Sequence, residues 1–91
     1  MKGLFDTGIV LITPWVKELY NKYDFFEPYN YIERHIQWDW GEVDMQDAKQ
    51  NDLAVSTFQR ILSVYSIWYD KFWVITEADR GVTTILLPSE Y

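Results

Sequence analysis

Three stretches in the second half of the chain place apolar residues at strand spacing. In Ile61–Trp68 both alternating faces are largely apolar, so we expect a strand that is covered on both faces and central in a sheet. Phe72–Thr76 is β-branched and aromatic, and Val82–Leu87 is followed by a proline, which cannot donate to a strand ladder. The connections Tyr69–Lys71 and Glu77–Gly81 are short and polar, which predicts antiparallel neighbours.

The first half of the chain begins with one more apolar stretch. Gly8–Thr13 is apolar on both alternating faces, which predicts a short buried strand. Thr13 and Pro14 then supply a hydroxyl N-cap and a proline at the first helical position. We therefore expect a helix over Pro14–Tyr23.

Two further helices are predicted before the sheet. Apolar residues at helical intervals indicate a helix from about Pro28 to Gln37. Asp44 has the character of an N-cap, with Asp47 in the first turn, and predicts a third helix from Met45 to about Val55. The order β-α-α-α-β-β-β favours a single α+β domain over residues 1–91, with a mostly antiparallel four-stranded sheet and helices on one face. The position of the first strand in the sheet is left open by the pattern.

Composition removes several classes of chemistry. The chain has 91 residues and no cysteine, which excludes disulfides, thiolate metal sites and thiol catalysis, and is typical of a protein of the reducing cytoplasm. No apolar run approaches the ~20 residues of a membrane span. The first six residues lack a long apolar region, so we expect no signal peptide.

Negative charge is concentrated in the middle of the chain. The segment Asp24–Asp52 has eight acidic and two basic residues, an excess equal to the net charge of −6 of the whole chain. Binding to a nucleic-acid backbone needs clustered Lys and Arg, so direct nucleic-acid binding is not expected. The segment favours a basic protein partner; the alternative interpretation is charge that merely keeps the protein soluble.

Several motifs together resemble one family of small proteins. These motifs are Arg34-His35, Trp38-Asp39-Trp40-Gly41, the run Ile75–Arg80 (Ile-Thr-Glu-Ala-Asp-Arg), Thr83-Thr84 and the ending Pro88–Tyr91 (Pro-Ser-Glu-Tyr). They resemble a family carried on bacterial plasmids, conjugative elements and phages, many of whose members are called plasmid-related proteins. Trp38 departs from the family pattern, which has glycine there. The resemblance implies a mobile-element setting and brings no catalytic residues with it.

His35 is the only histidine, and Asp39 and Asp44 follow it. Such a set could bind a metal or transfer a proton, but its spacing matches no zinc pattern, and we expect no metal, no cofactor and no catalytic residue. A structural role for His35, such as bonding to the Trp38–Gly41 loop, is preferred. A small enzyme centred on His35, Asp39 and Arg80 remains an alternative.

The connection Glu77–Gly81 is the second polar cluster. Glu77, Asp79 and Arg80 could form a site, but a structural role is preferred in which Arg80 pairs with an acid and fixes the turn. A buried Arg80 reaching Asp39 would join the two stretches that carry the family resemblance.

The leading functional hypothesis is a non-enzymatic inhibitor of a host defence nuclease, of the anti-CRISPR or anti-restriction kind. Its carboxylates would occupy a basic groove that normally receives nucleic acid, with Trp38 and Trp40 as anchors if they are exposed. The residues expected to bind the partner are Trp38, Asp39, Trp40, Glu42, Asp44, Asp47 and Asp52. The alternative is a structural or regulatory module of plasmid or conjugative-element maintenance, which binds through an apolar and aromatic surface.

Overall fold

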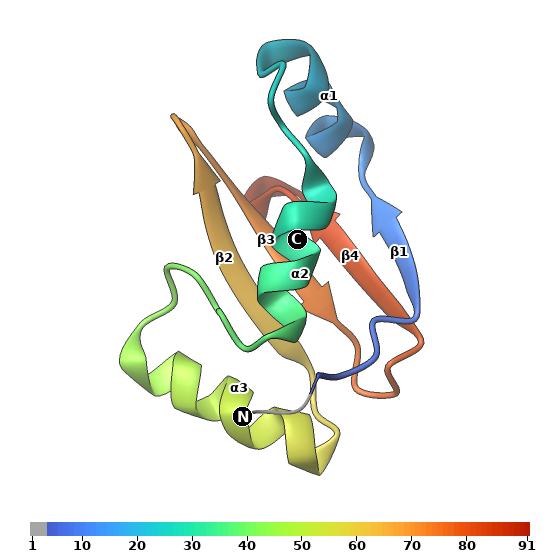
Figure 1. Cartoon of the computed structure of the whole chain (residues 1–91), viewed down its shortest axis with the longest axis vertical. Helices are drawn as coiled ribbons and strands as arrows, with labels where there is room; N and C mark the ends of the chain where they lie inside the picture. The colour runs from blue at the N-terminus through green and yellow to red at the C-terminus, as the bar shows by residue number, and fades with distance from the viewer. Residues whose placement is uncertain (1–3) are drawn as a thin grey trace.

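The elements follow one another in the predicted β-α-α-α-β-β-β order (Figure 1). The structure, a computed structural model, describes residues 4–91, so the expectation about a signal peptide falls partly on residues 1–3, outside the described residues. The elements are β1 (Ile9–Ile12), α1 (Pro14–Lys22), α2 (Pro28–Ile36), α3 (Met45–Thr57), β2 (Ile61–Ile67), β3 (Asp70–Thr76), β4 (Val82–Leu86) and a 3-10 turn (Pro88–Glu90).

The helices begin at side-chain caps that local sequence dictates. The Thr13 hydroxyl accepts a hydrogen bond from the Val16 amide at 3.4 Å, and the Asp44 carboxylate accepts one from the Asp47 amide at 2.7 Å, which confirms both predicted N-caps. Glu27 caps α2. The third helix runs two residues further than expected, because Phe58 ends it in a left-handed conformation with φ of 54°.

The sheet has the strand order β1-β4-β3-β2. Strand β1 runs parallel to β4, and the other neighbours are antiparallel. The prediction that the Ile61 strand is central was therefore wrong: β2 is an edge strand. Its outer edge is covered by the Trp40–Glu42 segment, because the Val64 amide donates to the Trp40 carbonyl at 3.0 Å and the Glu42 amide donates to the Val64 carbonyl at 2.7 Å.

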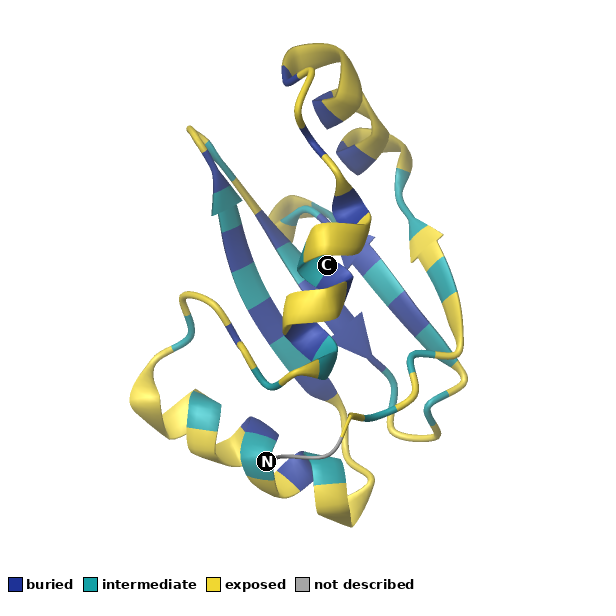
Figure 2. Ribbon diagram, in the orientation of Figure 1, coloured by how far each residue is buried: buried dark blue, intermediate teal, exposed yellow. Residues whose placement is uncertain are grey.

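Two other strand predictions need correction. Strand β1 was expected to be buried, but its residues alternate between exposed and half-buried, because β1 lies at the other edge of the sheet and the helices cover only one face (Figure 2). The first hairpin turn is Trp68-Tyr69, not Tyr69–Lys71, since Asp70 pairs with Ile67 in the ladder and Trp68 takes the positive φ of 52° that the turn requires.

All three helices pack on the same face of the sheet. Val16 and Leu19 of α1 and Ile32 of α2 belong to one apolar cluster with Tyr65, Phe72, Val74 and Ile85 of the sheet. Ala54 of α3 belongs to a second, smaller cluster with Trp40 and Ile61. On the opposite face the carboxyl-terminal turn lies against β3, where the Tyr91 ring contacts the Trp73 ring at 5.4 Å between centroids.

Candidate functional site

The two tryptophans of the acidic segment are largely inside the protein. Trp40 is buried, and its indole Nε1 donates a hydrogen bond to Asp52 at 2.9 Å. The half-buried Trp38 ring stacks against Trp40 with centroids 6.1 Å apart. Trp38, Trp40 and Asp52 therefore support the segment from within, and a partner could reach Trp40 only after a rearrangement.

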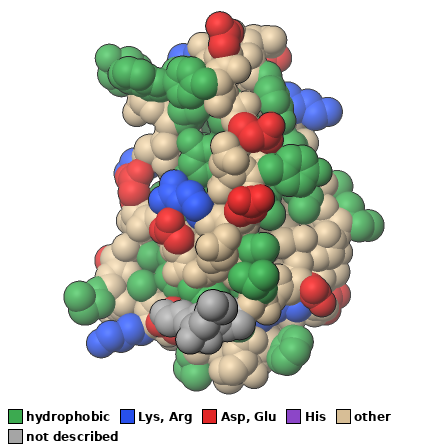
Figure 3. Space-filling view, in the orientation of Figure 1, with side chains coloured by type: hydrophobic (Ala, Val, Ile, Leu, Met, Phe, Trp, Pro, Cys, Tyr) green, Lys and Arg blue, Asp and Glu red, His purple; other side chains and the backbone are tan. Residues whose placement is uncertain are grey.

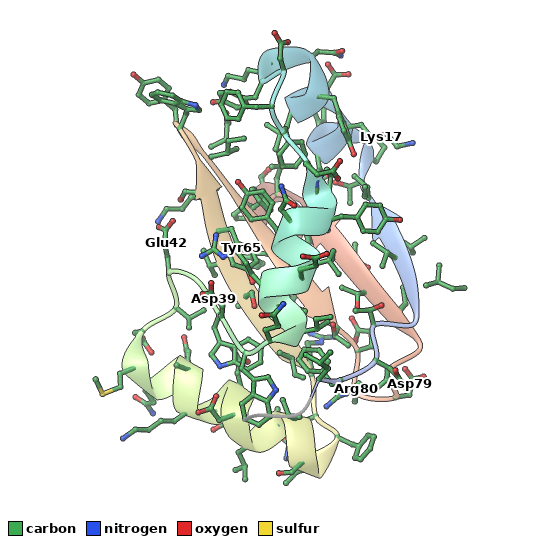
Figure 4. All side chains as sticks on the ribbon, in the orientation of Figure 1. Lys17, Asp39, Glu42, Tyr65, Asp79 and Arg80 are labelled. Atoms are coloured by element: carbon green, nitrogen blue, oxygen red, sulfur yellow. The ribbon has the colours of Figure 1, made fainter. Side chains whose placement is uncertain are left out.

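Two of the predicted carboxylates are matched by cations of the chain itself. Asp39 accepts a hydrogen bond from Arg34 Nε at 2.7 Å, and this bond holds the pKa of the Asp39 carboxyl below its ordinary value. Glu42 lies 3.5 Å from Lys71 Nζ. Figure 4 shows Asp39, Glu42 and Tyr65 on the same side of α2, where they line a groove of about 230 Å³ together with Arg34. Figure 3 shows positive and negative side chains interspersed over this face.

The remaining carboxylates gather where α3 begins. Asp44 caps the helix, and Asp47 is exposed one turn later. Met45, between them, is 76% exposed. We call Glu42, Asp44, Met45 and Asp47 the acidic corner. Its three carboxylates belong to the predicted partner-binding set, whereas Met45 was not predicted, and a protein partner could contact all four side chains without displacing the core.

His35 lies inside the protein and is bonded at both ring nitrogens. Its Nδ1 is 2.5 Å from the Ser63 hydroxyl, and its Nε2 is 2.9 Å from the Thr76 hydroxyl. Burial, aided by the positive charge of Arg80, lowers the pKa of His35 to about 3, so the ring is neutral at pH 7. The loop expected to bond this side chain instead packs on it, through an edge-on contact from Trp40.

The direction of each hydrogen bond around His35 follows from counting protons. The Thr83 hydroxyl donates to the Thr7 carbonyl at 2.8 Å, because a carbonyl only accepts. Thr83 has then used its proton, so Thr76 must donate to Thr83 across their 2.6 Å contact. By the same reasoning His35 donates to Thr76 from Nε2 and accepts from Ser63 at Nδ1. Neither nitrogen is left to take a proton from a bound molecule.

Arg80 joins three segments through their backbone. Its Nη2 donates a hydrogen bond to the Ala54 carbonyl at 2.8 Å, and its Nη1 donates to the carbonyls of Gln59 at 2.8 Å and Glu77 at 3.1 Å. Burial lowers the pKa of Arg80. Asp39 is held by Arg34, and not by Arg80 as sequence reasoning suggested.

The acids beside Arg80 have local partners. Glu77 pairs with Arg60 at 3.1 Å. Asp79 accepts a hydrogen bond from the Gly81 amide at 2.8 Å. The hydrogen bonds of Glu77, Asp79 and Arg80 therefore hold the β3–β4 turn and the end of α3 in place.

One exposed surface was not anticipated from the sequence. At the tip of the β2–β3 hairpin Trp68 is 70% exposed and Tyr69 is 93% exposed, and the Trp68 ring contacts the exposed Phe25 ring at 6.4 Å between centroids. We call these three residues the aromatic tip. Placing Trp68 in the hairpin turn, instead of in the strand, would have predicted its exposure.

No group of three His, Asp or Glu side chains among residues 4–91 is arranged to hold a metal ion. None of the helices found there has the length and apolar character to cross a membrane.

Comparisons with protein-family models, curated proteins and solved structures gave no match for this chain. The resemblance to plasmid-related proteins therefore stays a prediction.

Proposed function

We propose that this chain is a non-enzymatic inhibitor from a mobile genetic element, which binds a host defence nuclease of the CRISPR or restriction kind and occupies its basic nucleic-acid groove. The observation that carries the proposal is the acidic corner. Glu42, Asp44 and Asp47 are exposed there, and so is Met45, which follows Asp44 in the chain. Carboxylates attract a basic partner over long distances, and an apolar side chain among them adds buried contact area.

The acidic corner is held in place before any partner arrives. The Glu42 amide is fixed to the edge of β2 through the Val64 carbonyl, and Asp44 is fixed through its bond to the Asp47 amide. The buried Trp40 and its bond to Asp52 tie the preceding loop to α3. Such preorganisation reduces the ordering entropy that binding must overcome. In this proposal Trp38, Asp39, Trp40 and Asp52 support the surface, and Glu42, Asp44, Met45 and Asp47 contact the partner.

The test is protection of a targeted plasmid in cells that carry an active CRISPR or restriction system. Expression of the chain should raise the efficiency with which that plasmid is established. The double variant Asp44→Asn and Asp47→Asn should lose most of this protection, although asparagine still caps α3. The matched control is Asp24→Asn with Glu33→Gln, which removes the same charge from exposed positions outside the acidic corner. Absence of protection, or equal loss in the control, contradicts the proposal.

The aromatic tip favours a second candidate function. A module of plasmid or conjugative-element maintenance would bind an apolar protein surface, and Trp and Tyr are enriched at the energetic centres of such interfaces. Binding through Trp68 and Tyr69 should change little with salt, whereas binding through the acidic corner should weaken as salt rises. A pull-down from host cells at low and high salt, repeated with Trp68→Ala and with the similarly exposed Tyr29→Ala as control, separates the two functions.

A further inference from the structure

The outer edge of β1 carries backbone groups that face away from the sheet. The Ile9 amide donates to the Gly81 carbonyl and the Thr13 amide to the Ile85 carbonyl, both at 3.1 Å. Backbone groups alternate in direction along a strand, so those of Val10 and Ile12 point to the other side. Strand β1 is the last strand of the sheet, and no strand among the described residues lies beyond it.

The two edges of the sheet are treated differently. On β2, Asn51 bonds the amide and the carbonyl of Leu62, and the Trp40–Glu42 segment bonds those of Val64. No charged residue and no proline interrupts Ile9–Ile12, and Ile9 is 69% and Leu11 is 51% exposed. An uncharged apolar edge of this kind is a template for the addition of another strand.

We propose that a second copy of this chain pairs with β1, antiparallel and in one register, with the two-fold axis at Leu11. Residues opposed across an antiparallel pair share a face, and the outward backbone groups are those of Val10 and Ile12. Of the registers that meet these conditions, the one that pairs both outward residues within β1 places Val10 of each copy opposite Ile12 of the other, which gives four hydrogen bonds. Leu11 then lies against its own symmetry copy, on the sheet face away from the helices. The result is one continuous eight-stranded sheet.

Charge favours this occupant and this direction. Figure 4 shows Lys17 beside the upper end of β1 and Asp79 beside its lower end. Neither side chain has an ion pair within residues 4–91. An antiparallel two-fold arrangement brings the lower end of one copy beside the upper end of the other, so each Lys17 approaches Asp79 of the second copy. A closed dimer requires this self-complementary arrangement, whereas parallel pairing would bring like charges together.

The helix-covered side of the edge also fits a second copy. Beside β1 there is an apolar recess of about 60 Å³, lined by Val10, Ile12, Pro28, Tyr29 and Ile32. In the proposed register Val10 and Ile12 of the second copy point to this same face and extend the apolar surface across the axis. The paired strand is four residues long, so the contact is small and the dimer should be concentration-dependent.

Substitution at the axis tests the register. Leu11→Lys and Leu11→Glu should each be monomeric in sedimentation equilibrium, because like charges meet at the axis, and their equimolar mixture should restore a dimer. The matched control is Leu53→Lys on α3, since Leu53 is 54% exposed and lies away from β1; this variant should dimerise as the unmodified chain does. A dimer that survives both Leu11 substitutions would overturn the proposal.

Amide hydrogen exchange at high and low protein concentration provides the second measurement. The Val10 and Ile12 amides should become protected as concentration rises, while the exchange of the Asp70–Thr76 amides should stay constant. A chain that remains monomeric over the whole range, with the Val10 and Ile12 amides unprotected throughout, would overturn the proposal even if an extended peptide from another protein were found to bind this edge.

Discussion

The position of one proton matters most around His35. The ring is neutral, donates from Nε2 and accepts at Nδ1, and it belongs to a line of side chains that crosses three strands and ends at the Thr7 carbonyl. A hydroxyl that loses its partner in a buried site cannot turn to water. Deletion of the imidazole leaves the Ser63 hydroxyl without its acceptor and the Thr76 oxygen without its donor, although Thr76 still donates to Thr83.

We predict that His35→Ala lowers the free energy of unfolding at neutral pH by about 3 kcal/mol, because it leaves buried hydroxyls with unsatisfied hydrogen bonds and creates a cavity. Urea unfolding followed by tryptophan fluorescence measures the change. Glu33→Ala, an exposed site on the same helix, should stay within about 0.5 kcal/mol of the unmodified chain. A loss of similar size in both variants would mean that helix α2, and not the bonded imidazole, is what the substitution disturbs.

The same side chain makes stability depend on pH. In the unfolded chain His35 binds a proton near its ordinary pKa of 6.5, whereas in the folded chain the pKa is about 3. Between those values only the unfolded chain is protonated, so protons favour unfolding and stability falls as pH drops. We predict a steeper loss of unfolding free energy from about pH 7 to pH 4.5 for the unmodified chain than for His35→Ala. Parallel pH profiles would contradict the assignment.

For single residues, the sequence indicated which polar side chains have a structural role better than it indicated their hydrogen-bond partners. It singled out His35 and Arg80 as structural polar residues, but it gave Arg80 to Asp39. Arg34, five positions before Asp39, reaches that carboxylate because α2 ends and Trp38 turns the chain back with φ of 70°. Nothing in the pattern revealed that turn, since left-handed backbone is rare for residues other than glycine.

At the level of elements, β2 shows how an edge strand is closed without another strand. The Asn51 side-chain amide donates to the Leu62 carbonyl at 2.7 Å, and its oxygen accepts from the Leu62 amide at 3.2 Å. The Asn51 side chain thus makes the two hydrogen bonds to Leu62 that the backbone of a residue in a neighbouring strand would make.

We predict that Asn51→Ala costs about 2 kcal/mol of unfolding free energy, because it leaves the Leu62 amide and carbonyl without their partners. Thermal and urea unfolding measure the loss. Gln50→Ala, at the exposed neighbouring position of α3, is the control and should be nearly neutral. If Asn51→Ala is also neutral, water replaces the side chain and the edge is not closed by Asn51.

The helices and strands could largely be predicted from the sequence, whereas the position of each strand within the sheet could not. Periodicity and caps predicted the α-helices and the strands, but not the 3-10 turn Pro88–Glu90. The apolar outer face of β2 was interpreted as the mark of a central strand, but β2 is an edge strand whose edge is covered by the Trp40–Glu42 segment and by Asn51. Burial of Ile9–Ile12 was overestimated because an apolar stretch was taken to be buried, whereas these apolar residues lie at an open edge of the sheet. Strand order depends on contacts between distant segments, which a local pattern does not encode.

On the scale of the whole molecule, the hydrogen-bonded polar side chains of Ser63, Thr76 and Thr83, together with His35, divide the helix-covered face of the sheet. Ser63 lies between Ile61 and Tyr65 on β2, and these two residues belong to different apolar clusters. The smaller cluster holds α3, whose buried residues are Asn51 and Ala54. Helix α3 therefore has less apolar contact to resist local opening than the central strands have.

We predict that native-state hydrogen exchange shows α3 opening at a lower free energy than β3 and β4. Ala54→Gly, which weakens α3 by about 1 kcal/mol through helix propensity, should speed exchange of α3 amides and leave β3 amides unchanged at low denaturant. Equal opening energies for α3 and the strands would show instead that both clusters unfold as one cooperative unit.

The one-way order of protons along Ser63, His35, Thr76 and Thr83 has a consequence for how these positions can change over generations. Each residue donates one hydrogen bond to the next residue along the line. A substitution at one position therefore leaves the neighbouring side chain without its hydrogen-bond donor or acceptor, and no other atom replaces it. We therefore expect the four positions to change together, so that divergent descendants carry either the whole set or a wholly apolar replacement. Libraries that randomise these codons separately should yield few folded clones compared with libraries that vary them jointly.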